Sequence, residues 1–256
     1  LGLIAIGMVA MSMASNAPIG AVLATTTWSS VNSWTLAALP LFIWMGELLF
    51  RAGLSERMYQ GLAPWMHSLP GGLLHVNVLG CGVFAAVCGS SAATCATIGK
   101  IALPELKQRG YDERMSVGSL AGASTLGLLI PPSIPMIIYA VAANVSVIKV
   151  FLAGVLPGLL VMALYSGYIA IWALLNPSKM PRTQERMQLR ERLLRSLSLL
   201  PPVLLIGVIF ASMLFGWATA TECAAWGVAG ALLLAAWSRT LNRKMFVESV
   251  LAATRL

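Results

Sequence analysis

Long apolar runs follow one another along this chain, and few charged residues interrupt them. The first charged residue is Glu47, and only 10% of the 256 residues are charged, whereas 58% are hydrophobic. A soluble domain carries about 25% charged residues, and one soluble core of this size cannot bury so much apolar surface. With a mean hydropathy of +0.82, the sequence predicts an all-α polytopic membrane protein.

The net charge of +8 arises from 17 Lys and Arg against 9 Asp and Glu. Basic residues gather in the short breaks between apolar runs, as the positive-inside rule describes for cytoplasmic loops. We therefore interpret the charge as a topology signal and expect no nucleic-acid partner.

The four cysteines form no CxxC pair, so we expect neither a zinc site nor a disulfide framework. Cys81, Cys88 and Cys95 are seven residues apart and could share one helix face as small hydrophobic side chains.

Several apolar runs are long enough to cross a bilayer core, which requires about 20 residues per helix. These runs predict spans over 1–24, 33–50, 148–175, 197–216 and 219–237. The short mixed segment 55–69 predicts an amphipathic helix at the membrane interface, and the basic segment 177–195 predicts a loop. The chain opens on Leu1 inside an apolar run and closes at Leu256 just after an amphipathic stretch, so we expect a fragment of a longer protein.

Two further apolar stretches are interrupted, one at Gly89-Ser90-Ser91 within 73–103 and one at Pro131-Pro132-Ser133 within 115–143. If 73–103 enters the membrane and returns, both of its ends and every basic cluster face the cytoplasm. A stretch of about 30 residues also suits two half-depth helices better than one span. The sequence therefore predicts a re-entrant helical hairpin, followed by a broken helix over 115–143.

The predicted hairpin tip leaves backbone polar groups at membrane depth, where lipid cannot satisfy them. Gly89 permits the turn, and the hydroxyls of Ser90, Ser91 and Thr94 add oxygen atoms. Such a tip must line a cavity that is filled with water or buried in protein.

The second break adds a different set of oxygen atoms. Pro131 and Pro132 cannot donate N–H groups, which frees carbonyls near Gly127 and Leu128, and Ser133 supplies a hydroxyl. Two facing broken helices of this kind form the sodium and carboxylate sites of secondary transporters. We expect Ser90, Ser91 and Ser133 to be cation ligands. The alternative is a pair of packing kinks, because Gly and Pro are common in membrane helices.

Two acidic residues lie within or beside apolar runs, where acids are functional candidates. Glu47 precedes Arg51 by four residues, which favours an ion pair at the membrane edge. Glu222 follows Thr219 and Thr221 at the start of a span, which favours helix capping.

A membrane-embedded hydrolase would require a histidine or lysine base within reach of its serine. His67 and His75 fall at the interface or at a helix start, and no motif accompanies them. We therefore expect two interfacial histidines and no enzyme.

A series of motifs runs along most of residues 39–158. They are Leu39-Pro40-Leu41-Phe42-Ile43, Gly46-Glu47-Leu48, His75-Val76-Asn77-Val78-Leu79, Gly89-Ser90-Ser91-Ala92-Ala93-Thr94, Ile98-Gly99, Pro104-Glu105-Leu106-Lys107, Gly110-Tyr111-Asp112, Ile130-Pro131-Pro132-Ser133-Ile134-Pro135, Tyr139 and Gly154-Val155-Leu156-Pro157-Gly158. In this order and spacing they resemble the large membrane subunit of TRAP transporters, the DctM-like family.

The resemblance implies tripartite ATP-independent periplasmic transport across a bacterial inner membrane. A periplasmic substrate-binding protein would deliver an organic acid, such as a C4-dicarboxylate, and a small four-helix membrane subunit would brace this one. An inward sodium gradient would drive import by an elevator-type movement, with sodium as the coupling ion and no other cofactor. In that family the first hairpin and the next broken helix form half of the ion and substrate site. That half falls here on Gly89, Ser90, Ser91, Thr94, Gly127, Pro131, Pro132 and Ser133.

The resemblance also implies how the chain is divided. Residues 1–175 would form the first inverted repeat, 176–196 a basic cytoplasmic loop, and 197–256 the start of the second repeat, whose hairpin would follow. Many members carry an acid where this chain has Thr94, and Ala220 stands where the family usually has proline before Thr-Glu. A related sodium-carboxylate carrier that needs no binding protein remains the alternative.

Overall fold

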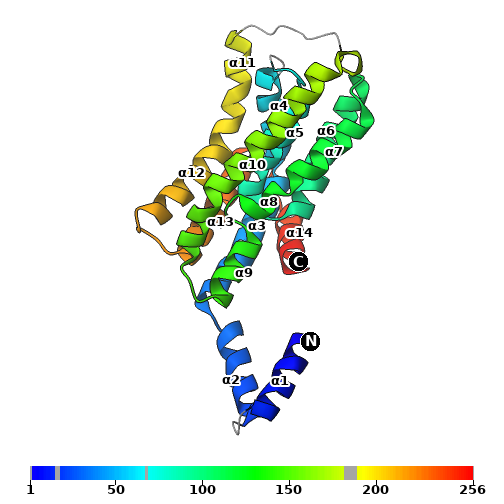
Figure 1. The fold of residues 1–256 in the computed structure, drawn as a ribbon. Coiled ribbons are helices and arrows are strands. Elements are labelled where there is room, and N and C mark those ends of the chain that lie inside the picture. Colours follow the sequence, from blue (N-terminus) through cyan, green and yellow to red (C-terminus); the bar gives the residue numbers. More distant parts are fainter. Residues whose placement is uncertain (1, 15–17, 67–68, 182–188, 256) are drawn as a thin grey trace.

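The computed structural model describes residues 2–14, 18–66, 69–181 and 189–255, and this part of the chain is helical without strands (Figure 1). In chain order the helices are α1 (Gly2–Ala14), α2 (Ile19–Val31), η1 (Trp34–Ala37), α3 (Ala38–Arg51), α4 (Leu54–Met66), α5 (Leu74–Cys88), α6 (Ser91–Gln108), α7 (Glu113–Ser124), α8 (Leu126–Leu129), α9 (Ile134–Ala142), α10 (Val147–Leu175), η2 (Pro177–Lys179), α11 (Leu189–Ser196), η3 (Leu197–Leu199), α12 (Leu200–Leu214), α13 (Ala220–Trp237) and α14 (Arg243–Arg255).

Within the described residues, five helical segments are long and apolar enough to cross a membrane. They are Trp34–Arg51, Glu113–Ala142, Val147–Leu175, Arg190–Leu214 and Ala220–Trp237. The prediction of an all-α polytopic membrane protein is thereby confirmed.

The N-terminal region differs from the single span expected over 1–24. It forms two helices of 13 residues each, α1 and α2, which stand apart from the rest of the molecule in Figure 1 (blue). Pro18 directly precedes α2 in an extended conformation. A proline suits the position directly before a helix, because it has no N–H to donate and its ring disfavours a helical turn before it.

The described body of the protein has two hydrophobic cores. The first gathers the apolar faces of α3, α13 and α14 together with the neighbouring ends of α9, α10 and α12, and its centre includes Met45, Leu48 and Ala224. The second gathers α5, α6, α7 and α10 around Leu74, Phe84 and Leu126. The two cores meet where Gly46 of α3 lies against the end of α5; a Cβ atom at Gly46 would be 2.9 Å from Cys88 Cα.

The interfacial segment expected over 55–69 forms α4, which presents Met58 and Tyr59 inward and Glu56, Arg57 and Gln60 outward. This amphipathic pattern is the one that a helix in the interface plane requires. His67 lies outside the described residues.

The prediction of a loop over 177–195 is wrong for the last part of this basic segment, because α11 begins at Leu189. A Glu191–Arg195 ion pair of 3.1 Å joins residues one turn apart in this helix. Such i,i+4 pairs stabilise a helix whose outer face is charged. Residues 182–188 lie outside the described part.

The basic segments share one end of the molecule. Lys179 Nζ lies 3.8 Å from Asp112 Oδ2, and one cavity is lined by Lys100, Arg109 and Arg195 together. The prediction that 100–114 lies at the same end as the basic segment before α12 is therefore confirmed for the described residues. That this end faces the cytoplasm stays a prediction.

Candidate functional site

The hairpin turn consists of two residues between α5 and α6. Gly89 follows α5 in the left-handed conformation, with φ of 62°, which residues other than glycine seldom adopt. Ser90 is extended and precedes α6, and its Oγ accepts a long hydrogen bond of 3.5 Å from Ala93 N–H. The chain therefore reverses within a few ångströms, as the Gly-Ser-Ser sequence predicted.

The second break separates α8 from α9. Ile130 is extended after α8, Pro131 and Pro132 are joined by a cis peptide bond, and Ser133 precedes α9 in an extended conformation. The Ser133 hydroxyl donates to the carbonyl of Leu128 at 2.8 Å. One of the carbonyls that the prolines were predicted to free is thus satisfied by the serine that follows them.

The two breaks are in direct contact. Ile134 N–H donates to the Gly89 carbonyl at 3.3 Å, and a Cβ atom at Gly89 would lie only 2.4 Å from the Pro132 carbonyl oxygen. On the other side, a Cβ atom at Gly127 would lie 2.9 Å from Ser91 N. Glycine at 89 and 127 is therefore what allows the two breaks to approach this closely.

Four helix ends meet at this point. The N-termini of α6 and α9 carry partial positive charge, and the C-termini of α5 and α8 carry partial negative charge. An anion is favoured beside the first pair and a cation beside the second. The helix ends themselves thus provide regions of positive and of negative electrostatic potential.

The hydroxyl groups at the breaks direct their hydrogens at carbonyls. Ser91 donates to Ser124 O at 2.9 Å, and Thr94 donates to Ser90 O at 2.7 Å. With its hydrogen used in this way, each hydroxyl oxygen still has lone pairs that can face a cation. Thr94 and Ser133 are fully buried, so any ion that reached them would be sheltered from bulk water.

No group of three or more His, Cys, Asp or Glu suited to a metal ion occurs among residues 2–14, 18–66, 69–181 and 189–255. A cation at the breaks would therefore be held by carbonyl and hydroxyl oxygens. Hard cations accept such ligands, whereas zinc and the softer transition metals prefer nitrogen and sulfur.

The structure brings together all eight predicted site residues, but their role in binding stays a prediction. Sequence reasoning missed the direct contact of Ile134 with Gly89 and the packing of Gly46 behind the hairpin turn. Both contacts join residues far apart in the sequence. The only early signal was that Gly46 and Ile134 lie in motifs of the family resemblance.

The sequence profile described as "Tripartite ATP-independent periplasmic transporter, DctM component" matches residues 1–256. The chain belongs to the DctM family. This is a family of transporters of the bacterial inner membrane, not of enzymes, and the present member is a multi-pass membrane protein. The resemblance inferred from the motifs is confirmed.

Individual DctM relatives differ in what their names say they transport. The chain is 36% identical over 203 residues to the C4-dicarboxylate TRAP transporter large permease protein DctM of Pseudomonas aeruginosa, covering 79% of this chain and 47% of that protein. It is 33% identical over 220 residues to the sialic acid TRAP transporter large permease protein SiaM of Vibrio cholerae, covering 85% and 51%. It is 34% identical over 210 residues to the ectoine/5-hydroxyectoine TRAP transporter large permease protein UehC of Ruegeria pomeroyi, covering 80% and 47%. The chain spans about half the length of these relatives.

The two acidic candidates have structural partners in this DctM chain. Glu47 Oε2 lies 3.2 Å from Arg51 Nε, as predicted, and Arg51 also binds Glu248 of α14 at 2.7 Å. Glu222 forms a capping box with Thr219 at the start of α13, as predicted. These contacts give both acids a role in stabilising helices.

His75 lies at the start of α5, one of the two places expected for the histidines, and its side chain is buried among neighbouring residues. Its Nε2 lies 2.7 Å from the Pro70 carbonyl and its Nδ1 lies 2.6 Å from Ser166 Oγ. Since a carbonyl only accepts, Nε2 carries the hydrogen and Nδ1 accepts from Ser166. The histidine thus ties the start of α5 to α10.

The three cysteines do not lie on one helix face, because the turn at Gly89 separates Cys81 and Cys88 on α5 from Cys95 on α6. All three thiols are free, and Cys81 is fully buried. Cys81 behaves as the small hydrophobic side chain that the sequence predicted.

Proposed function

We propose that this chain supplies one half of the ion and substrate site in a sodium-driven importer of organic acids. The observation that carries the proposal is the contact between the Gly89 turn and the Pro131–Ser133 break, where four helix ends and several hydroxyls meet. Secondary transporters build their midplane sites from such discontinuous helices.

The chemistry of the two kinds of helix end supports sodium and a carboxylate as the two solutes. A sodium ion would be held by carbonyl oxygens at the ends of α5 and α8 and by the hydroxyls of Ser90, Ser91 and Ser133. A carboxylate would lie toward the N-termini of α6 and α9, where the helix ends carry partial positive charge. We propose a C4-dicarboxylate or a similar organic acid as the substrate, as the name of the Pseudomonas aeruginosa relative suggests.

We further propose that the chain works with a small four-helix membrane subunit and a periplasmic substrate-binding protein. Membership of a family described as tripartite and periplasmic supports these partners. The binding protein would deliver the acid, and movement of the hairpin with its attached broken helix would carry ion and acid across the bilayer.

The test is the sodium dependence of uptake in vesicles that contain the gene product carrying this chain and its two partners. Ser90→Ala and Ser133→Ala each remove one proposed sodium ligand. Loss of one such partner costs about 1–3 kcal/mol, so the sodium concentration for half-maximal uptake should rise about tenfold.

Ser12→Ala is the matched control, because Ser12 lies on α1 and its hydroxyl donates to Val9 O of its own helix. Its sodium activation curve should equal that of the unmodified protein. Unchanged sodium activation in both Ser90→Ala and Ser133→Ala would refute the site and leave two packing kinks.

A further inference from the structure

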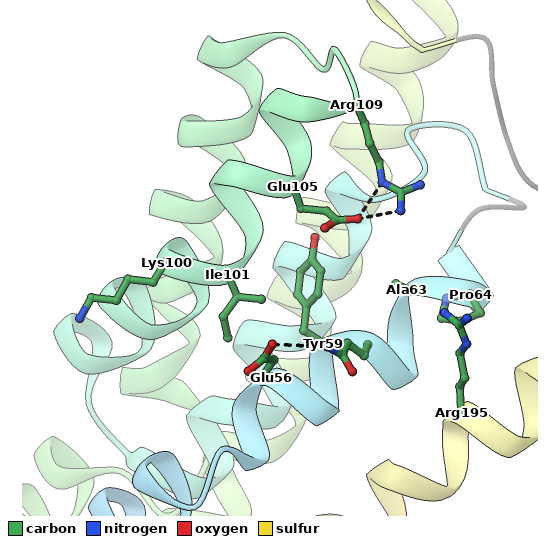
Figure 2. A pocket seen from close by; sticks show the side chains of 10 residues that line it. Glu56, Tyr59, Ala63, Pro64, Lys100, Ile101, Glu105, Arg109 and Arg195 are labelled. Atoms are coloured by element: carbon green, nitrogen blue, oxygen red, sulfur yellow. Dashed lines mark hydrogen bonds and ion pairs between the residues drawn. The ribbon is translucent and has the colours of Figure 1, made fainter.

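A cavity of about 450 Å³ lies between α4, α6 and α11, away from the two breaks and at the end of the molecule that holds the basic segments (Figure 2). Three cations and two carboxylates line it: Lys100, Arg109, Arg195, Glu56 and Glu105. The family assignment and the proposed transport site leave this cavity without a role.

Tyr59 projects into this cavity from α4, and Figure 2 shows its ring directed toward Glu105 of α6. The side chain is 4% exposed, and its hydroxyl is buried without a hydrogen-bond partner among the described residues. A buried hydroxyl without a partner loses the hydrogen bonds that it would make with water. Burial and the nearby Glu105 carboxylate raise the pKa of Tyr59 above its ordinary value, so the hydroxyl keeps its hydrogen and can donate it.

Two arginines reach the cavity from different helices, and both have donors to spare. Arg109 binds Glu105 through Nε and Nη2 at 2.8 and 2.7 Å, and Arg195 binds Glu191 through Nη2 at 3.1 Å. A guanidinium carries five N–H groups, so these ion pairs orient each arginine and leave other N–H groups for a ligand. Both side chains are roughly half exposed and open to solvent.

Charged side chains of both signs surround the cavity. Arg109 neutralises Glu105, and Glu56 accepts a hydrogen bond from Gln60 at 3.4 Å, whereas Lys100 makes no ion pair within the described residues. Arg195 is paired with Glu191, so the three cations of the lining stand beside three carboxylates. Arginine N–H groups and a phenol hydroxyl that line the same cavity are donors suited to the oxygens of a phosphate group.

We propose that this cavity binds a phosphate group, held by Tyr59 Oη and by the guanidinium groups of Arg109 and Arg195. The phosphate can belong to a phospholipid headgroup or be free in solution. Because α4 is amphipathic, it places the cavity at headgroup depth, and basic pockets on the cytoplasmic side of membrane proteins bind anionic lipid headgroups. The apolar side chains of Ala63 and Pro64 in the cavity wall would contact the glycerol part of such a lipid.

The experiment measures binding of two probes to the purified gene product that carries this chain. In one arm, native mass spectrometry follows retention of phosphatidylglycerol after delipidation and titration; in the other, thermal unfolding follows stabilisation by inorganic phosphate. Tyr59→Phe removes only the unpartnered hydroxyl, and Arg195→Gln removes one guanidinium. Each variant should weaken binding at least about tenfold, as expected for loss of a hydrogen bond to a charged group.

Tyr168→Phe is the matched control, because Tyr168 is an exposed tyrosine on α10 outside this cavity. This variant should bind both probes as tightly as the unmodified protein. Retention of phosphatidylglycerol that depends on Tyr59 and Arg195 identifies a lipid as the source, and stabilisation by inorganic phosphate with the same dependence identifies a free phosphate. If neither probe binds, or if both bind the two variants as tightly as the unmodified protein, the proposal is overturned. Arg195→Gln keeps the test valid if Tyr59→Phe does not fold.

Discussion

Gly89 shows how much of the candidate site depends on single residues. Its φ of 62° costs a non-glycine residue about 1–2 kcal/mol, and a side chain there would also collide with the Pro132 carbonyl at 2.4 Å. We predict that Gly89→Ala lowers the apparent melting midpoint of the detergent-purified protein and its yield in the membrane. The overpacking adds about 1–3 kcal/mol to the backbone strain.

The substitution Gly110→Ala separates the cost of backbone strain from the cost of the collision. Gly110 also has a positive φ, of 79°, but a Cβ atom there would meet nothing within 4 Å. It therefore carries the backbone strain without the collision. Equal destabilisation by the two substitutions would show that the Gly89 turn is not packed against Pro132 as described.

At the scale of helices, the prediction from sequence succeeded where a local signal was strong. The Gly-Ser-Ser and Pro-Pro-Ser interruptions located the two breaks, and the distribution of basic residues indicated which ends lie together. It failed over 1–24, where Pro18 divides an apolar run, and at Leu189, where the Glu191–Arg195 ion pair stabilises a helix within a basic segment.

The contacts between elements could not be predicted, because hydrophobic periodicity reports only which face of a helix is buried. Nothing local indicates that Trp44 Nε1 donates to Ser249 Oγ of α14 or that Arg51 reaches Glu248. The same holds for the contact between Gly89 and Ile134. The sequence could therefore supply the residues of the candidate site but not how they meet.

The hairpin itself leads to a topology prediction at this scale. Gln108 at the end of α6 and Ser178 after α10 are exposed at the same end of the molecule, and Asn144 is exposed in the turn between α9 and α10 at the other. We predict that Gln108→Cys and Ser178→Cys react with an impermeant thiol reagent only from the cytoplasmic side, and Asn144→Cys only from the periplasmic side. Labelling of Gln108→Cys and Ser178→Cys from opposite sides would contradict the re-entrant hairpin.

At the scale of the whole molecule, the described body exposes much apolar surface. Long stretches of α10 and α12 point large side chains outward, among them Leu156, Leu164 and Leu204, which are more than half exposed. An apolar face of this extent meets lipid or another protein segment. Inverted-repeat transporters place their sites at the interface between repeats, so that each repeat contributes one hairpin and one broken helix.

The described residues contribute one such hairpin and one such broken helix, and the chain spans about half the length of the relatives. We predict that residues 1–256 produced alone, even with the small subunit and the binding protein, neither transport an organic acid nor bind sodium measurably. The oxygens around Ser90 and Pro131 would face an incomplete cavity. Too few ligands would then be present to replace the free energy that a cation loses with its hydration shell. Uptake into liposomes with an imposed sodium gradient measures this, and the complete Pseudomonas aeruginosa relative with its own partners is the positive control. Gradient-dependent uptake by residues 1–256 above that of empty vesicles would show that one repeat is sufficient, as in a dimer whose second copy supplies the missing ligands.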